Sequence, residues 1–353
     1  MLGKEYNVIG LMSGTSGDGL DMAYCKFNYN GKHWNFVIDQ AITFDYPEYL
    51  LDSMRIADTL SASDFLKLHN TVGIFFGNQV NRFIRDNKLS VHFIASHGHT
   101  VFHQPNERLN FQIGNPQIIR QITGLPVVAD FRTQNILNGG QGAPLVPIGD
   151  KLLFHQYHYC INIGGFSNIS YENNKKQRIA FDICPVNIVL NMLAKSKHKT
   201  FDKNGEIGKK GKIYLPLLKE LNKLTYYQQS PPKSLGKEWI TAFFLPILNY
   251  YNIPIEDKMR TIYEHIVIQF QNVLNNLPVG TILLTGGGTH NHFLVELLQK
   301  NINHKIIIPE KKIIDYKEAL IFAFLGVLRM ENITNCLSSY TGSNSDMVCG
   351  VIF

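Results

Sequence analysis

A glycine-rich turn near the start of the chain has the residue types expected of a phosphate-binding loop. Residues 10–21 read GLMSGTSGDGLD and continue a strand-like apolar segment. Glycines let backbone N–H groups approach a phosphate closely, and carboxylates at such a turn can hold Mg²⁺ through water. The alternative is an ordinary hairpin turn, which the density of glycines and aspartates disfavours. The candidate phosphate-binding residues are Gly14, Thr15, Ser16, Gly17, Asp18, Gly19 and Asp21, of which Asp18 and Asp21 are the candidate Mg²⁺ ligands.

Two further glycine turns could contact the same kind of ligand. Residues 162–169 read NIGGFSNI, which alone predicts a plain β-turn, but beside the first turn suggests two loops that clamp one polyphosphate. Residues 283–291 read LLTGGGTHN, so three glycines end a strand and precede a helix, where ligands bind in open α/β sheets. This turn does not match G-x-G-x-x-G, and the chain has no Walker A pattern, which disfavours nicotinamide cofactors and a P-loop fold. The glycines concerned are Gly164, Gly165, Gly286, Gly287 and Gly288.

A carboxylate and a guanidinium lie at the ends of two other strand-like segments. Asp182 precedes a helix expected to begin near Pro185, so it could cap that helix or act as a general base. Arg132, in the segment VADFR, is suited to bidentate capture of a carboxylate, although an internal pair with Asp130 is the simpler interpretation.

Three histidines form the strongest competing hypothesis. His97, His99 and His103 could share one face of an extended strand and bind a metal, which would make the protein a metal hydrolase. The chain lacks H-E-x-x-H, and we favour structural or substrate-contacting roles for these side chains.

The composition is that of a globular protein. The 353 residues are 44% hydrophobic and 18% charged, enough for about two domains. The net charge of +6 is spread thinly, which disfavours a nucleic-acid partner but suits an anionic ligand. We expect a cytoplasmic protein without a membrane partner, because the start resembles no secretory signal, no apolar run approaches 18 residues, and the five cysteines form no disulfide framework.

Strands alternate with helices along the chain, which predicts an α/β fold. The longest predicted helix spans residues 63–88, with Ser63 as its N-cap. The breaker sequence NGGQGAP at residues 138–144 suggests a domain junction, so we expect domains 1–135 and 136–353. The strand-turn-strand patterns after residue 158 are similar to those near the N-terminus.

Taken in order, these motifs resemble the anhydro-N-acetylmuramic acid kinase family from about residue 6 to residue 343. The shared segments are the first glycine turn, ASHG at 95–98, QIGNP at 112–116, ADFR at 129–132, GGQGAPLVP at 139–147, NIGG at 162–165, PPKS at 231–234, GGG at 286–288 and KEA at 317–319. The chain departs from the family at DICPVN, residues 182–187, where the family usually has DTGPGN, and at His99, where it commonly has glutamine. Cys184 and Val186 cannot adopt positive φ as glycine does, so the turn beside Asp182 is expected to differ.

The resemblance implies a two-domain, actin-like and ribonuclease-H-like sugar kinase fold with an interdomain active-site cleft. The last helix and the tail would pack back on the first domain, and the protein would form a homodimer. It also implies an ATP- and Mg²⁺-dependent reaction of cell-wall sugar recycling, in which water opens the 1,6-anhydro bridge of anhydro-N-acetylmuramic acid while O6 takes the γ-phosphoryl group. Alternatives are a kinase for another sugar acid and a catalytically impaired ATP-binding relative.

The same resemblance assigns roles to particular residues. Asp182 would be the general base on the water, and the three glycine turns would bind ATP. Arg132 would pair with the lactyl carboxylate of the sugar, and His97 and Glu318 would line the sugar site.

Overall fold

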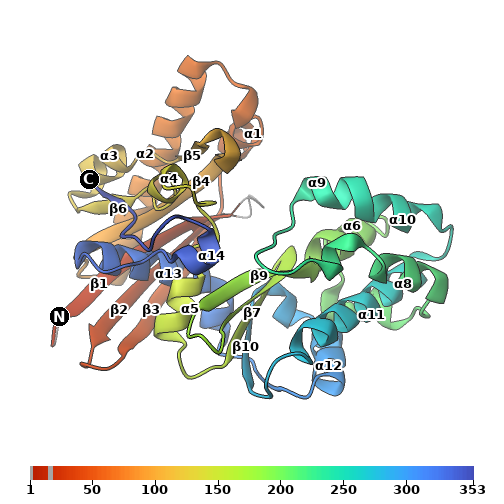
Figure 1. Ribbon diagram of the computed structural model, residues 1–353. Coiled ribbons are helices and arrows are strands. Elements are labelled where there is room, and N and C mark those ends of the chain that lie inside the picture. The colour runs from red at the N-terminus through yellow and green to blue at the C-terminus, as the bar shows by residue number, and fades with distance from the viewer. Residues whose placement is uncertain (1–2, 15–18) are drawn as a thin grey trace. The chain divides into compact units, whose positions relative to one another are not determined.

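The computed structural model describes residues 3–14 and 19–353 and contains two compact units (Figure 1). Unit 1 comprises residues 1–154 and 316–353, and unit 2 comprises residues 155–315. The division between the units therefore falls later than the domain boundary expected after residue 135. Residues 136–154 belong to unit 1 because helix α5 (Pro147–Leu153) packs against β3 (Trp34–Phe44) and against Ile321 of α13 (Lys311–Met330).

Unit 1 is built on a seven-stranded sheet in the order β12-β6-β4-β1-β2-β3, with β5 beside β4. The first three strands form an antiparallel meander, whereas β4 runs parallel to β1 and β6 runs parallel to β4. Its C-terminal strand, β12, pairs with β6, so the end of the chain completes this sheet. The strands not yet given bounds are β1 (Glu5–Ser13), β2 (Leu20–Tyr29), β4 (Phe93–Gln104), β5 (Leu109–Ile113), β6 (Val127–Ala129) and β12 (Val351–Ile352).

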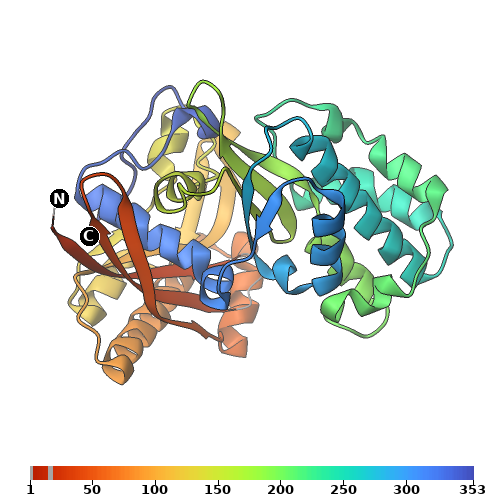
Figure 2. The same cartoon turned by 90° about the horizontal axis from the view of Figure 1, so that it is seen from below.

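Helices cover both faces of this sheet. Val72 and Phe76 of α2 (Ala62–Asn87) pack in one apolar cluster with Ile9 and Leu11 of β1. On the other face, Gly10 approaches the backbone of α13 so closely that no side chain would fit, and Figure 2 shows α13 lying along the sheet. The N-cap of α2 is Ser61, whose hydroxyl accepts from the Asp64 N–H, and not the predicted Ser63. The remaining helices of unit 1 are α1 (Glu48–Arg55), α3 (Pro116–Thr123), α4 (Thr133–Leu137) and α14 (Ser338–Thr341).

Unit 2 is built on a five-stranded sheet in the order β11-β10-β7-β8-β9. Its apolar core joins these strands to the long helix α11 (Ile255–Leu274), through residues such as Ile161, Ile262 and Phe270. The strands are β7 (Tyr159–Ile163), β8 (Phe166–Glu172), β9 (Arg178–Pro185), β10 (Thr281–Thr285) and β11 (Lys305–Ile307). The other helices are α6 (Asn187–Lys195), α7 (Glu206–Lys209), α8 (Leu215–Asn222), α9 (Lys237–Trp239), α10 (Leu245–Tyr250) and α12 (His292–Asn301).

The two sheets repeat one topology. Each sheet begins with an antiparallel meander of three strands. A fourth strand then pairs in parallel with the first strand of the meander, and a fifth strand pairs in parallel with the fourth. The order β3-β2-β1-β4-β6 therefore corresponds to β9-β8-β7-β10-β11. This duplicated, ribonuclease-H-like order confirms the predicted α/β, actin-like fold class. The expected interdomain cleft stays a prediction. Among the described residues, no helix combines the length and hydrophobicity needed to cross a membrane.

Candidate active site

The predicted glycine turns follow the first strand of each meander and strand β10 of unit 2. Gly14 and Gly19 flank the first turn, after β1, and Asp21 lies in β2. Thr15, Ser16, Gly17 and Asp18 lie outside the described residues, so their expected phosphate and Mg²⁺ contacts stay predictions. Strand β1 is parallel to β4, and β7 is parallel to β10. Each turn follows one of these strands and therefore lies at a carboxyl end, where α/β sheets bind ligands.

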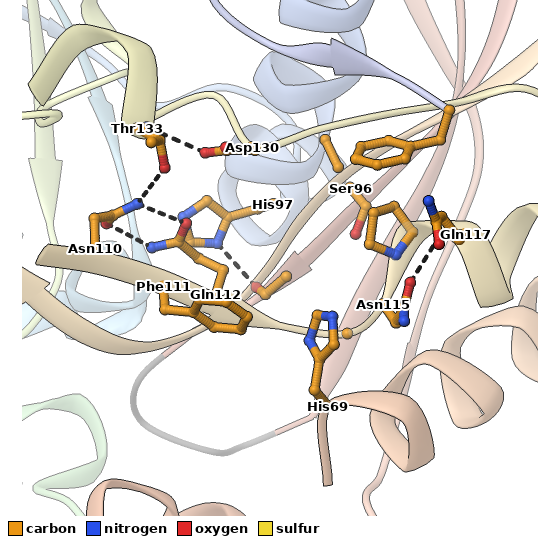
Figure 3. Close-up of a pocket in the computed structure, with 15 residues that line it drawn as sticks. His69, Ser96, His97, Asn110, Phe111, Gln112, Asn115, Gln117, Asp130 and Thr133 are labelled. Carbon is orange, nitrogen blue, oxygen red and sulfur yellow. Dashed lines mark hydrogen bonds between the residues drawn. The ribbon is translucent and has the colours of Figure 1, made fainter. Parts of the chain in front are cut away.

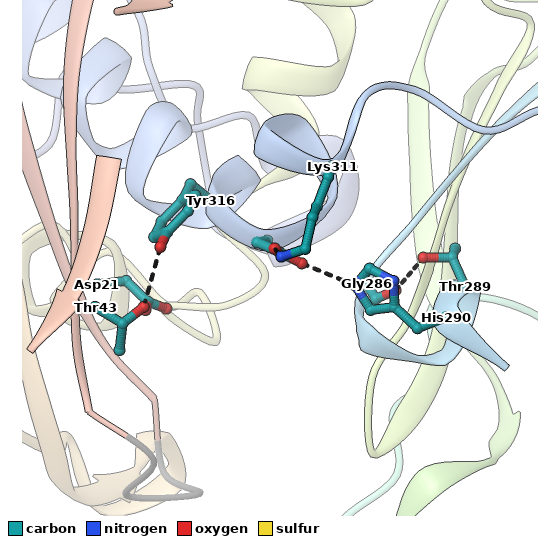
Figure 4. A network of polar contacts seen from close by, with 8 residues as sticks. Asp21, Thr43, Gly286, Thr289, His290, Lys311 and Tyr316 are labelled. Atoms are coloured by element: carbon teal, nitrogen blue, oxygen red, sulfur yellow. Dashed lines mark hydrogen bonds and ion pairs between the residues drawn. The ribbon is translucent and has the colours of Figure 1, made fainter. Parts of the chain in front are cut away.

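The turn after β10 has one glycine that is free of packing. A Cβ on Gly286 would lie 2.6 Å from Asn162 Oδ1, and one on Gly288 would lie 2.2 Å from the Ile163 side chain. A Cβ on Gly287 would meet nothing within 4 Å. Gly286 and Gly288 are therefore required for packing against the end of β7, whereas Gly287 faces open space that a ligand can enter. Figure 4 shows the Thr289 hydroxyl donating to the Gly286 carbonyl at 2.7 Å, which closes this turn.

The Gly164-Gly165 turn binds the start of α6. The Gly165 carbonyl accepts from the Val186 and Ile188 N–H groups, and the Gly164 carbonyl accepts from Asn187. The Gly164 N–H donates to the Phe166 carbonyl. This turn therefore fixes the segment that follows Asp182, in addition to any contact with phosphate.

Asp182 is held by the loop that contains the PPKS sequence. Its Oδ2 accepts from the Leu235 N–H at 2.8 Å, its N–H donates to the Lys233 carbonyl, and its carbonyl accepts from the Tyr226 hydroxyl. Oδ1 has no hydrogen-bond partner within the described part of the chain. Burial raises the pKa of this carboxyl from 3.8 to about 6, although the Leu235 N–H opposes the shift. The result is a fixed carboxylate with one available oxygen and a pKa near physiological pH, as a general base requires.

The turn after Asp182 forms without glycine. Pro185 is the last residue of β9, and the helix begins at Asn187 rather than near Pro185 as predicted. Val186 adopts φ −131°, and both Cys184 and Val186 are completely buried in the core of unit 2. Positive φ is therefore not needed here, and the two side chains fill the core without displacing Asp182 from its hydrogen bonds.

A bulge in β4 separates the histidines that were predicted to share a face. Gly98 has φ +74°, and the register between β1 and β4 shifts at this point. The His97 ring packs against Phe322 of α13. The His99 ring is hydrogen-bonded to the Ser13 hydroxyl, which also accepts from Tyr46, and Tyr46 belongs to the apolar cluster on the α2 face of the sheet. The two rings thus lie on opposite faces. No group of three His, Cys, Asp or Glu side chains among the described residues could hold a metal ion, which argues against the hydrolase alternative.

The buried His97 and the half-buried Arg132 are joined by hydrogen bonds. Nδ1 of His97 contacts the Gly98 carbonyl, which can only accept, so Nδ1 carries the proton. Nε2 accepts from Arg132 Nε at 3.1 Å and Nη2 at 2.8 Å, and Nη1 donates to the Gly142 carbonyl at 2.7 Å. Burial and the Arg132 charge hold the pKa of His97 well below 6.5. His97 is therefore neutral and orients a guanidinium that keeps two of its five N–H groups available.

Glu318 lies in the same electrostatic cluster of unit 1. The Glu318 side chain is exposed, but neighbouring protein atoms remove part of the water around its carboxyl. This desolvation and the repulsion from Asp21 raise the pKa of the carboxyl. Lys317 and Arg132 oppose that shift. Lys317 itself is buried and bonds Asp150 of α5 at 2.7 Å. Unit 1 therefore brings together Asp21, His97, Arg132 and Glu318, which are distant in sequence.

Asp21 is a suitable ligand for a hydrated cation. The Thr43 hydroxyl donates to its Oδ1 at 2.6 Å and lies 3.4 Å from the Tyr316 hydroxyl, as Figure 4 shows. A half-buried carboxylate beside a glycine turn fits Mg²⁺ carried in by phosphates, because Mg²⁺ is commonly held by one or two carboxylates, waters and substrate oxygens.

Comparison with known proteins identifies the family. A family model described as anhydro-N-acetylmuramic acid kinase matches residues 6–353. Proteins of that name from Crocosphaera subtropica and Francisella tularensis subsp. novicida are 34% and 32% identical, and cover 98% and 99% of both chains respectively. One from Clostridioides difficile is 32% identical, covering 98% of this chain and 97% of its own. A dehydratase activator from Clostridium difficile with bound ADPNP is 14% identical with TM-score 0.43, covering 92% of this chain and 97% of its own, which is too distant to support an argument.

The strand order repeated in the two units places the chain in the actin-like fold class to which sugar kinases belong. More narrowly, the chain belongs to the anhydro-N-acetylmuramic acid kinase family.

Proposed function

We propose that this chain uses ATP to open the 1,6-anhydro bridge of anhydro-N-acetylmuramic acid and to phosphorylate O6, giving N-acetylmuramic acid 6-phosphate and ADP. The full-length match to the family supports the reaction, and the observation that carries the mechanism is Asp182, a carboxylate fixed through Oδ2 with a pKa of about 6. A role in recycling cell-wall sugars follows from this substrate.

The chemistry assigns one task to Asp182. Oδ1 accepts a proton from water as the water oxygen bonds to the anomeric carbon, and the bond from that carbon to O6 breaks. As that bond breaks, O6 takes the γ-phosphoryl group of ATP, and ADP leaves. A carboxylate suits this role because it accepts a proton without adding positive charge beside an oxocarbenium-like centre.

Arg132 and Glu318 are the proposed sugar contacts. The available N–H groups of Arg132 would bind the lactyl carboxylate, and His97, whose ring nitrogens both have protein partners, would line the site and orient Arg132. Glu318 would accept from a sugar hydroxyl. Asp21, with Asp18, would hold Mg²⁺ through water, and that ion would offset charge on the phosphates.

The glycine turns are the proposed ATP-binding elements, and Gly287 allows a direct test. Gly287→Ala is expected to leave thermal stability unchanged, because its Cβ would enter open space. It should raise the KM for ATP roughly tenfold by obstructing one hydrogen bond to phosphate. Gly288→Ala is the matched comparison, since it should lower the melting temperature by clashing with Ile163. An unchanged KM in Gly287→Ala would remove this turn from the ATP site.

The pH dependence should follow the ionisation of Asp182. Because a general base must be deprotonated, kcat/KM should rise about tenfold per pH unit below pH 6 and level off above it. Rates measured from pH 4.5 to 8, with folding monitored at each pH, test this. A flat profile across that range would exclude Asp182 as the base.

A coupled ADP-release assay tests the proposed function. The native chain should release ADP only when Mg·ATP and 1,6-anhydro-N-acetylmuramic acid are both present. Release with another sugar acid alone would favour a related kinase. ATP binding without release for any sugar acid would favour a catalytically impaired relative.

We also propose a cytoplasmic homodimer with no nucleic-acid or membrane partner. The thinly spread net charge of +6 supports the absence of a nucleic-acid partner, and the five buried cysteine thiols support a cytoplasmic location. Light scattering and fractionation would test it.

A further inference from the structure

A cavity of about 300 Å³ opens in unit 1 where two parallel strands separate. Strand β4 pairs with β6 only through Ile94 and Ala95, and beyond the Gly98 bulge it pairs with β5 instead. The space between is lined from both strands and from the start of α3, as Figure 3 shows. It therefore lies at the carboxyl end of β6 and directly after the part of β4 that pairs with β6, a usual place for a ligand in an α/β sheet.

The cavity contains a buried hydroxyl without a partner. Ser96 is 1% exposed and lines the cavity, and its Oγ has no hydrogen-bond partner among the residues that the structure describes. His69 also lines the cavity, and its buried Nδ1 likewise has no hydrogen-bond partner among the residues that the structure describes. Since buried polar groups are nearly always hydrogen-bonded, these atoms indicate a ligand with polar groups.

The charges around the cavity exclude an anionic ligand group. Within the described chain, no lysine or arginine lines it, but the carboxylate of Asp130 does. The start of α3 adds little attraction for an anion, because Pro116 has no N–H and the Asn115 side chain already accepts from Gln117. Asp130 Oδ1 accepts from the Thr133 N–H, and its Oδ2 can accept from a ligand.

The remaining wall is apolar. Phe111, Ala129 and Phe353 line the cavity beside these polar groups. A fitting ligand group thus needs an acceptor for Ser96, a donor for Asp130 and a small apolar end. An acetamido group has all three, in its carbonyl oxygen, its N–H and its methyl.

We propose that this cavity binds the 2-acetamido group of the sugar, with Ser96 and Asp130 as specificity-determining residues. The assignment rests on the proposed function, whose substrate carries two appendages on the ring. His97 lines the cavity and accepts from Arg132, which itself does not line it. The neutral appendage and the lactyl carboxylate thus have adjacent, chemically distinct subsites on either side of His97.

Isothermal titration calorimetry tests the subsite without requiring turnover. The native chain is titrated with 1,6-anhydro-N-acetylmuramic acid and with the analogue in which a hydroxyl replaces the 2-acetamido group. The native chain should bind the analogue about 100-fold more weakly. Ser96→Ala should weaken binding of the acetamido compound about tenfold and leave binding of the analogue within twofold.

A second variant and a control keep the test independent of folding. Asp130→Asn should show the same selective loss, since asparagine tolerates the φ of +54° at this position but turns an amide donor toward the ligand. Ser53→Ala, at an exposed serine of α1, should bind both compounds as the native chain does. Equal native affinity for the two compounds, or equal losses in both variants for both compounds, would overturn the subsite alone. A native chain that binds neither compound would overturn the proposed function as well.

Discussion

Replacing Asp182 with asparagine is expected to lower kcat by about 10²–10⁴-fold. Asparagine retains an oxygen that can accept from the Leu235 N–H, so the side chain should stay in place. It cannot take a proton from water, so the attack on the anomeric carbon loses its base. Steady-state ADP release by the native and variant chains measures the effect.

Stability measurements separate this loss from misfolding. The pKa of Asp182 is raised from 3.8 to about 6, so folding favours its protonated form. The stabilisation of that form is fully present below about pH 3.8 and is lost as pH rises through about 6. At pH 7.5 the neutral asparagine should therefore melt at the same temperature as the native chain or higher. A variant that melts lower and binds ATP poorly would show that Asp182 is structural.

Lys317→Met should lower the free energy of unfolding by about 3–5 kcal/mol, because it leaves a buried carboxylate without its cation. Lys317 and Asp150 are each 4% exposed, and their charged groups lie 2.7 Å apart. The ammonium group also lies 5.3 Å from the centre of the Phe154 ring. The change should appear in urea unfolding followed by circular dichroism, and as weaker sugar binding, since Lys317 also holds down the pKa of Glu318.

Two comparisons identify the cause of that loss. The double variant Lys317→Met, Asp150→Leu should recover much of the stability, because it removes both buried charges. Lys223→Met, in an exposed pair with Glu220, should change stability little. A loss as large in Lys223→Met, or no recovery in the double variant, would contradict the assigned role of the buried pair.

Much of the architecture is predictable because local patterns determine it. The helical spacing of Val72, Phe76, Val80 and Phe83 predicts α2 within one or two residues of its ends. Short apolar segments that end in glycine turns predict β7 and β10. The strand-turn-strand patterns after residue 158 suggest a repeat of the first unit, but the strand order itself comes from the structure.

The rest depends on tertiary contacts that no local pattern contains. Period-two alternation places His97 and His99 on one face, but the single bulge at Gly98 reverses the second ring. The breaker cluster at residues 138–144 is a loop inside unit 1, since α5 beyond it packs on β3 and α13. The cavity at Ser96 arises only where β4 leaves β6, and the hydrogen bond from Leu235 to Asp182 spans 53 residues. The two prolines at residues 231–232 are the sequence feature that predicts a loop at this point.

Running the reaction in H₂¹⁸O and measuring the product masses by mass spectrometry tests most directly whether this chain both opens the bridge with water and phosphorylates O6. The sugar product should gain one phosphoryl group and one ¹⁸O atom, located on the anomeric carbon, with one ADP per sugar. A phosphorylated sugar that keeps its bridge, or ¹⁸O in released inorganic phosphate with the sugar unchanged, would contradict the proposed reaction.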